Sequence, residues 1–208
     1  QKGVSANQIK RTINVSYKTA WYLCHPIRAP MTEADPPMLT GIVEVDETYV
    51  GGKVRGKGHG YIKNKAIVVG AIQRHGGLVL QVVGDTRKPT LQGFIHEHVA
   101  GNAEAIYTDE HPSYRGIGDA NTRHETVNHS AEEWARGDVT TNDIEGVWSL
   151  FKRSVIGTYH QLSEKHLDAY LDELEWRFKN RENPYLFRDT LVKLINSENL
   201  PYQQLVKQ

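Results

Sequence analysis

The sequence predicts an α/β fold, with a five-stranded mixed sheet flanked by helices and a small helical element at the N-terminus. Two observations predict this class: short runs of β-branched and apolar residues bounded by turn residues, and helical apolar spacing in other segments. The 208 residues are enough for one such domain and a small appendage. We expect a partial helix-turn-helix over 1–31, a proline-rich linker over 32–38, the main domain over 39–182 and a helical extension over 183–208.

The order of the predicted elements narrows the fold further. The elements are, in sequence, strands at 42–46, 66–72 and 78–83, a helix at 90–99, strands at 103–108 and, more weakly, 125–129, and helices at 141–155 and 163–180. The second and third strands are separated by His75-Gly76-Gly77, which indicates an antiparallel hairpin. Three antiparallel strands, a helix, two more strands and then helices form the order of a ribonuclease H-like fold.

The N-terminal segment has the pattern of two short helices joined by a turn. Ser5 and Ser16 are predicted to be their N-caps, because a serine hydroxyl accepts a free N–H of the first helical turn. Pro26 is expected to shorten or kink the second helix. One interpretation of this pair is a DNA-recognition element, and the other is a two-helix element that only packs against the main domain.

The net charge of zero conceals two basic segments. Residues 1–28 hold five basic side chains and no acidic ones, and residues 48–67 hold five more, also without acids. Such segments suit contacts with DNA phosphates, although solvated loop lysines would give the same pattern. The second segment supplies the candidate DNA contacts Lys53, Arg55, Lys57, Lys63 and Lys65.

Several classes of protein are excluded by composition. The sequence has no apolar run long enough to cross a membrane, and its first residues lack the apolar stretch of a signal peptide. The single cysteine, Cys24, excludes an internal disulfide and a zinc site made of cysteines. We therefore expect a cytoplasmic protein without a membrane partner.

Three acidic residues occupy positions that suit divalent-metal chemistry. Asp46 lies in the first predicted strand, where aspartate is disfavoured unless it has a function, and Asp109 follows the fourth strand. Glu145 lies with Asn142 and Lys152 on the polar flank of an amphipathic helix, whose apolar stripe includes Trp148. Taken singly, each acid could also be a surface residue or, for Asp109, part of a turn. Together they would offer the oxygen ligands that Mg²⁺ prefers.

The spacing of these acids resembles a known signature. Thirty-five residues separate Asp109 from Glu145, and Lys152 follows seven positions later, as in the Asp-Asp-35-Glu motif of retroviral integrases and many insertion-sequence transposases. Over roughly residues 40–182 the chain resembles one group of bacterial insertion-sequence transposases, in the segments VDETYVGGK, YTDEHPSY, VNHS, TNDIEGVWSLFKR and GTYHQLSEKHLDAYLDELEWRFKNR. In that group a zinc ribbon commonly precedes the helix-turn-helix, and this sequence contains no zinc-ribbon cysteines.

The resemblance implies a DDE-type DNA transposase, which cleaves DNA and joins the freed strand to target DNA by in-line phosphoryl transfer. It implies that Asp46, Asp109 and Glu145 are catalytic and bind two Mg²⁺ or Mn²⁺ ions, with Lys152 close to the DNA. It also implies a homodimer or larger multimer on DNA and a location at the bacterial nucleoid. The next residue, Arg153, is a further candidate for phosphate contact.

Two residues are candidates for the surroundings of this site. Asn142 shares the helix flank of Glu145, and His129 ends the fifth predicted strand, where a structural histidine would fit equally well. Two other functions stay open. The chain could be a ribonuclease H-like nuclease that hydrolyses nucleic acid without joining it, or an inactive or domesticated DNA-binding protein. A strand-transfer assay separates the first from a transposase, and a metal-dependent shift in melting temperature separates the second.

Overall fold

The structure, a computed structural model, describes residues 3–51, 65–127, 136–159 and 162–207. The chain divides into two compact units. One is Asp35–Leu150, and the other combines Gln1–Ala34 with Phe151–Gln208. This division by packing falls after Ala34 and after Leu150. It does not test the domain limits predicted at 38 and 182, which stay a prediction.

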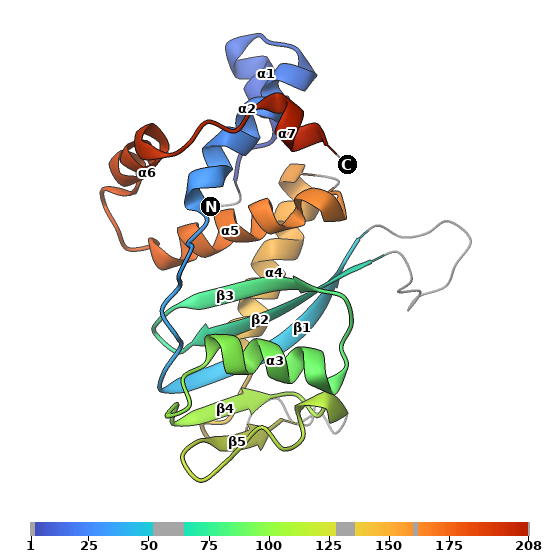
Figure 1. Cartoon of the computed structure of the whole chain (residues 1–208), viewed down its shortest axis with the longest axis vertical. Coiled ribbons are helices and arrows are strands. Elements are labelled where there is room, and N and C mark those ends of the chain that lie inside the picture. Colours follow the sequence, from blue (N-terminus) through green and yellow to red (C-terminus); the bar gives the residue numbers. More distant parts are fainter. Residues whose placement is uncertain (1–2, 52–64, 128–135, 160–161, 208) are drawn as a thin grey trace, which may run out of the picture. The chain divides into compact units, whose positions relative to one another are not determined.

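The unit Asp35–Leu150 is built on a five-stranded mixed sheet (Figure 1). Its strands are β1 (Ile42–Val50), β2 (Ala66–Gln73), β3 (Leu78–Val83), β4 (Ala105–Thr108) and β5 (Arg123–Thr126). The first three pair antiparallel, whereas β4 pairs parallel with both β1 and β5. The resulting order, β3-β2-β1-β4-β5, is that of a ribonuclease H-like sheet and confirms the predicted fold class.

One face of the sheet packs against helix α3 (Lys88–His98). Leu91, Phe94 and Ile95 recur at the helical spacing that predicted this helix, and all three are buried. Removing each such side chain from water contributes about 1.5–3 kcal/mol to folding. Val43 and Val45 of β1 join this core, and because side chains alternate along a strand, Glu44 and Asp46 face the other side. Helix α4 (Asn142–Ser154) lies on that side and bonds to both acids.

The second unit is helical. Its helices are α1 (Ala6–Ile13), α2 (Tyr17–Arg28), α5 (Leu167–Lys179), α6 (Leu186–Asn196) and α7 (Tyr202–Val206), with 3-10 turns at Ala29–Met31 and Glu164–His166 and a π-helical turn at Val155–Tyr159. The predicted caps are confirmed, since the Oγ atoms of Ser5 and Ser16 accept the N–H groups of Gln8 and Thr19. Whether α1 and α2 recognise DNA stays a prediction.

Pro26 is predicted to shorten or kink the second helix, and of these two outcomes the shortening does not occur. Helix α2 continues through Pro26 to Arg28. Proline removes one backbone N–H from the helix, but Cys24, His25 and Arg28 are buried where α2 packs against α5. This packing holds the last turn in helical form despite the missing bond.

Other boundaries differ by a few residues. Strand β1 runs four residues beyond the predicted 42–46 because it pairs with β2 as far as Val50. The predicted helix at 163–180 begins instead as the 3-10 turn Glu164–His166, and Ser163 makes no side-chain capping bond. Within the described ranges, no helix combines the length and apolar character needed to cross a bilayer.

Candidate catalytic site

Asp46 and Asp109 come together because β1 and β4 are parallel neighbours. The two strands pair with Glu44 opposite Tyr107, and Asp46 and Asp109 each lie two positions further along in the same register. Parallel strands deliver such residues to one edge of a sheet, the edge at which α/β folds place ligands. Asp109 leads out of β4 into a turn, in which its Oδ1 accepts the N–H of His111 at 2.9 Å. Asp109 can therefore both form this turn and lie beside Asp46.

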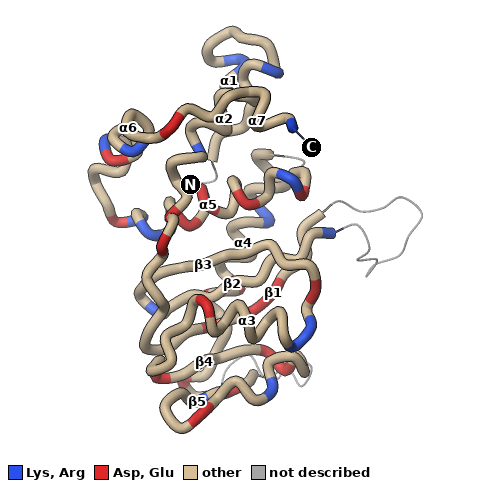
Figure 2. The backbone as a smooth tube through the Cα atoms, in the orientation of Figure 1, with Lys and Arg blue, Asp and Glu red and all other residues tan. Residues whose placement is uncertain are grey.

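Acidic side chains surround Asp46 at this edge, and acidic positions are visible along β1 in Figure 2. Burial, followed by the nearby carboxylates of Glu47 and Asp109, raises the pKa of Asp46 to about 7. Burial and the nearby Asp109 carboxylate also raise the pKa of Glu47. The buried Tyr114 donates its hydroxyl to Glu47 at 2.6 Å. The largest influences on the pKa of Asp46 include no basic side chain, although His111 lowers the pKa of the neighbouring Glu47. Such crowding of acids is expected at a cation-binding site.

Asp46 is held in place by a tryptophan of α4. The indole Nε1 of Trp148 donates to Asp46 Oδ2 at 2.9 Å. The ring of Trp148 fits over β2 because the residue paired with Asp46 is Gly70. A Cβ atom at Gly70 would lie 2.7 Å from Trp148 Cη2, so a glycine is needed at this close approach. The sequence predicted Trp148 only as part of the apolar stripe of the helix.

Glu44, two residues before Asp46, fixes the start of α4. Its carboxylate is 1% exposed, and its Oε2 accepts the N–H groups of Asp143 at 2.9 Å and of Ile144 at 3.3 Å. Its Oε1 pairs with Arg74 Nε at 3.0 Å. A helix N-terminus has free N–H groups and a partial positive charge, so a carboxylate from another strand can cap it. Glu44 therefore ties the helix that carries Glu145 to the strand that carries Asp46.

Glu145 lies in the first turn of α4 and is half-buried. Its Oε1 accepts the hydroxyl of Thr141 at 2.9 Å. In the described part of the chain, no three or more His, Cys, Asp or Glu side chains are already arranged to hold a metal ion. The structure thus brings Asp46 and Asp109 together and holds the helix of Glu145 against β1. The role of Glu145 as the third metal ligand stays a prediction.

The remaining candidate residues are placed as follows. Asn142 is exposed at the first position of α4, where its N–H bonds to Thr140 Oγ1 at 2.8 Å. Lys152 and Arg153 are exposed in the last turn of the same helix, and Lys65 is half-buried just before β2. Lys53, Arg55, Lys57, Lys63 and His129 lie outside the described residues.

Comparison with known proteins agrees with the resemblance to insertion-sequence transposases. Residues 38–179 match the family described as the ISXO2-like transposase domain. An uncharacterized transposase-like protein of Haemophilus influenzae is 32% identical over 101 residues, which cover 49% of this chain and 80% of that protein.

Two solved structures are also similar. A simian T-cell lymphotropic virus intasome in complex with PP2A regulatory subunit B56 gamma has a TM-score of 0.36 and 13% identity, covering 99% of this chain and 72% of that one. A pre-cleavage Mos1 transpososome has a TM-score of 0.38 and 11% identity, covering 96% and 77%. The family match spans most of the chain, including all three candidate acids, and the chain belongs to the ISXO2-like transposase domain family of DDE-type insertion-sequence transposases.

Proposed function

We propose that this chain catalyses divalent-metal-dependent cleavage of DNA and transfer of the freed strand during transposition of an insertion sequence. One observation carries the proposal: the parallel pairing of β1 and β4 brings Asp46 and Asp109 to the same sheet edge, in a chain of a transposase family. The Asp109 carboxylate lies close enough to raise the pKa of Asp46. The 35-residue spacing to Glu145 supplies the third acid of the family pattern.

The side chains at this edge fit Mg²⁺ or Mn²⁺. Asp46, Asp109 and Glu145 would hold two such ions, since hard divalent cations prefer carboxylate oxygens. The fit rests on the crowding of Asp46 with Glu47 and Asp109, because a bound cation would relieve that repulsion. Once bound, the ions would stabilise the charge on the attacking and leaving oxygens of an in-line displacement.

The contribution of the protein itself is positioning. Trp148 orients the Asp46 carboxylate, and Glu44 fixes the first turn of α4, from which Glu145 projects. Phosphoryl transfer depends mainly on such positioning and on charge stabilisation, so rigid support of the acids is what the chemistry requires. A covalent protein intermediate is not needed.

DNA is the proposed partner, as the transposon end and as the target. The proposed phosphate contacts come from two segments. The basic segment 48–67 supplies Lys53, Arg55, Lys57, Lys63 and Lys65, and the end of α4 supplies Lys152 and Arg153. Binding through such residues weakens steeply with salt, because each neutralised phosphate releases counterions. We also propose a homodimer or larger multimer on DNA, since two transposon ends are processed together.

The experiment is a strand-transfer assay on the full chain with Mg²⁺. The substrates are duplexes of the DNA that flanks the coding region, with the 3′ ends already cut, and a supercoiled plasmid as target. We expect joined products from the wild-type chain and none from Asp46→Asn, which should still bind the duplex. Asp35→Asn, at an exposed aspartate of the same unit, is the matched control and should join DNA normally.

The other outcomes of this assay would replace the proposal. Cut but unjoined DNA would identify a hydrolytic nuclease. Binding without either reaction, unchanged by Mg²⁺ or Mn²⁺, would identify a DNA-binding protein that has lost catalysis. Joining by Asp46→Asn at the wild-type rate would show that the reaction does not depend on this sheet edge.

A further inference from the structure

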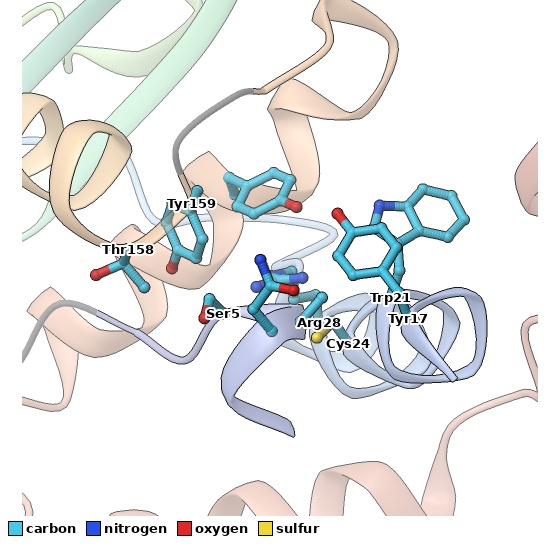
Figure 3. Close-up of a pocket in the computed structure, with 10 residues that line it drawn as sticks. Ser5, Tyr17, Trp21, Cys24, Arg28, Thr158 and Tyr159 are labelled. Atoms are coloured by element: carbon cyan, nitrogen blue, oxygen red, sulfur yellow. The ribbon is translucent and has the colours of Figure 1, made fainter. Parts of the chain in front are cut away.

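A second, oppositely charged site lies in the helical unit. A pocket of about 50 Å³ is lined by the start of α1, by α2 and by residues of Val155–Tyr159 and α5 (Figure 3). A cavity needs about 10–15 Å³ on this scale to hold one water molecule, so the pocket has room for a few waters or one small ion. Asn7 and Tyr17 at its walls are exposed to solvent, whereas Arg28 is buried.

Arg28 is the unusual residue of this pocket. It is only 4% exposed, and its Nε pairs with Glu173 Oε2 at 2.7 Å. Its Nη1 is buried and has no hydrogen-bond partner among the described residues. The neighbouring group is the thiol of Cys24, a weak acceptor. Burying part of a guanidinium without an acceptor is costly, so this donor is expected to have a partner that the described residues do not supply.

The local charges favour an anion as that partner. Glu173 is shared, because Arg177 pairs with its Oε1 at 2.7 Å and the hydroxyl of Tyr159 donates to its Oε2 at 3.1 Å. Two arginines therefore face one carboxylate, which leaves one positive charge in excess. None of the described residues that line the pocket is acidic.

The first turn of α1 adds further donors. Ser5 caps the helix, and its backbone and side-chain oxygens take up the N–H groups of Gln8 and Ile9. The N–H groups of Ala6 and Asn7, the first two of the helix, have no carbonyl within the helix to bond, and both residues line the pocket. A helix N-terminus is a favourable place for a phosphate or a similar anion.

We propose that this pocket binds a single tetrahedral oxyanion of the phosphate type. Arg28 Nη1 donates from the buried end, the N–H groups of Ala6 and Asn7 donate from the helix, and the hydroxyl of Tyr17 stands at the mouth. The oxyanion comes either from a DNA backbone phosphate or from free inorganic phosphate. All residues of this pocket belong to the helical unit, and the proposal does not depend on the catalytic one.

The test compares Asn7→Asp with Asn7→Ser in the full chain. An aspartate at the second position of α1 suits the helix dipole, so Asn7→Asp should fold, but its charge would repel the anion. Melting temperatures are measured in sodium phosphate and in sodium chloride of equal ionic strength. Because phosphate also stabilises proteins by exclusion from their surface, the readout is the difference between the variants. At saturating phosphate, wild type and Asn7→Ser should gain about 2–4 °C more than Asn7→Asp.

A second measurement identifies the source of the oxyanion. Binding of a mixed-sequence duplex is followed by fluorescence anisotropy over a range of salt concentrations. If a DNA phosphate fills the pocket, Asn7→Asp should bind more weakly than Asn7→Ser, with a salt slope smaller by about 1. If free phosphate fills it, both variants should show the same slope. Either result sustains the proposal, whereas an equal phosphate-dependent rise in melting temperature for all three proteins would overturn it.

Discussion

Glu44 and Asp46 lie two residues apart on one face of β1, yet their carboxylates have opposite surroundings. Glu44 has a full set of partners: the Arg74 guanidinium on one oxygen and two N–H groups of α4 on the other. Asp46 accepts the indole N–H of Trp148 and the backbone N–H of Glu47, and it has two acidic neighbours but no ion-pair partner among the described residues. A buried carboxylate whose partners all come from the fold holds structure together. A carboxylate crowded by like charges is instead poised for a cation from outside the protein.

The comparison predicts its largest effect for Glu44→Gln. The substitution keeps the shape of the side chain but removes the charge that pairs with Arg74 and caps α4. Breaking a buried ion pair from one side costs about 3–5 kcal/mol, and we expect a loss of that size in the free energy of unfolding. Urea denaturation measures it.

Glu125→Gln is the matched control in the same sheet. Glu125 pairs with Arg123 at 3.1 Å and Arg136 at 3.6 Å, and its side chain is 30% exposed. Its loss should cost less than about 1 kcal/mol, because exposed ion pairs contribute little. Equal effects of the two substitutions would show that Glu44 has no special part in holding α4.

A smaller effect is expected for Gly70→Ala, which disturbs the support of Asp46. The added methyl group would meet Trp148 Cη2 at 2.7 Å and Leu80 Cδ2 at 2.8 Å. Overpacking of this kind costs about 1–3 kcal/mol and should shift the indole away from Asp46. Urea denaturation and tryptophan emission report the two consequences. Gly93→Ala in α3 is the control, because a Cβ there meets nothing within 4 Å, and it should be neutral or slightly stabilising. An equal loss of stability in both variants would show that the contact with Trp148 is not the cause.

The smallest effect has the opposite sign and concerns Asp46→Asn in the absence of metal. At pH 8 this substitution should raise the free energy of unfolding by about 1–2 kcal/mol, because it removes a desolvated charge beside two acids. The pH dependence follows from the pKa, which is about 7 in the folded chain and about 4 in the unfolded one. Between these values the folded chain binds more protons, so wild-type stability falls as pH rises, and the variant lacks this fall. Urea titrations from pH 4 to 8 measure it. A wild-type curve that rises over this window would contradict the sign.

Much of the fold could be predicted from local sequence. The alternation in Ile42–Val50 and the spacing of Leu91, Phe94 and Ile95 each specify an element within a few residues. The confirmed caps Ser5 and Ser16 act within their own helices. Helix α2 is not shortened at Pro26, because packing on α5 outweighs a local preference of the backbone.

The site could be predicted only in part. The acids could be chosen from their spacing, but their supports come from distant segments: Glu44 caps a helix 99 residues away, and Trp148 donates across 102 residues to Asp46. Periodicity identified Trp148 as apolar and was silent about its N–H. One signal was present in the sequence, since two acids on one face of a buried strand need partners.

The central claim is that the Asp46–Asp109 edge binds divalent cations. The most direct test is a titration of the metal-free chain with Mn²⁺, with free Mn²⁺ measured by electron paramagnetic resonance. We expect the wild type to bind Mn²⁺, and Asp46→Asn and Asp109→Asn each to weaken binding at least about tenfold. Unchanged Mn²⁺ affinity in both variants would contradict the claim.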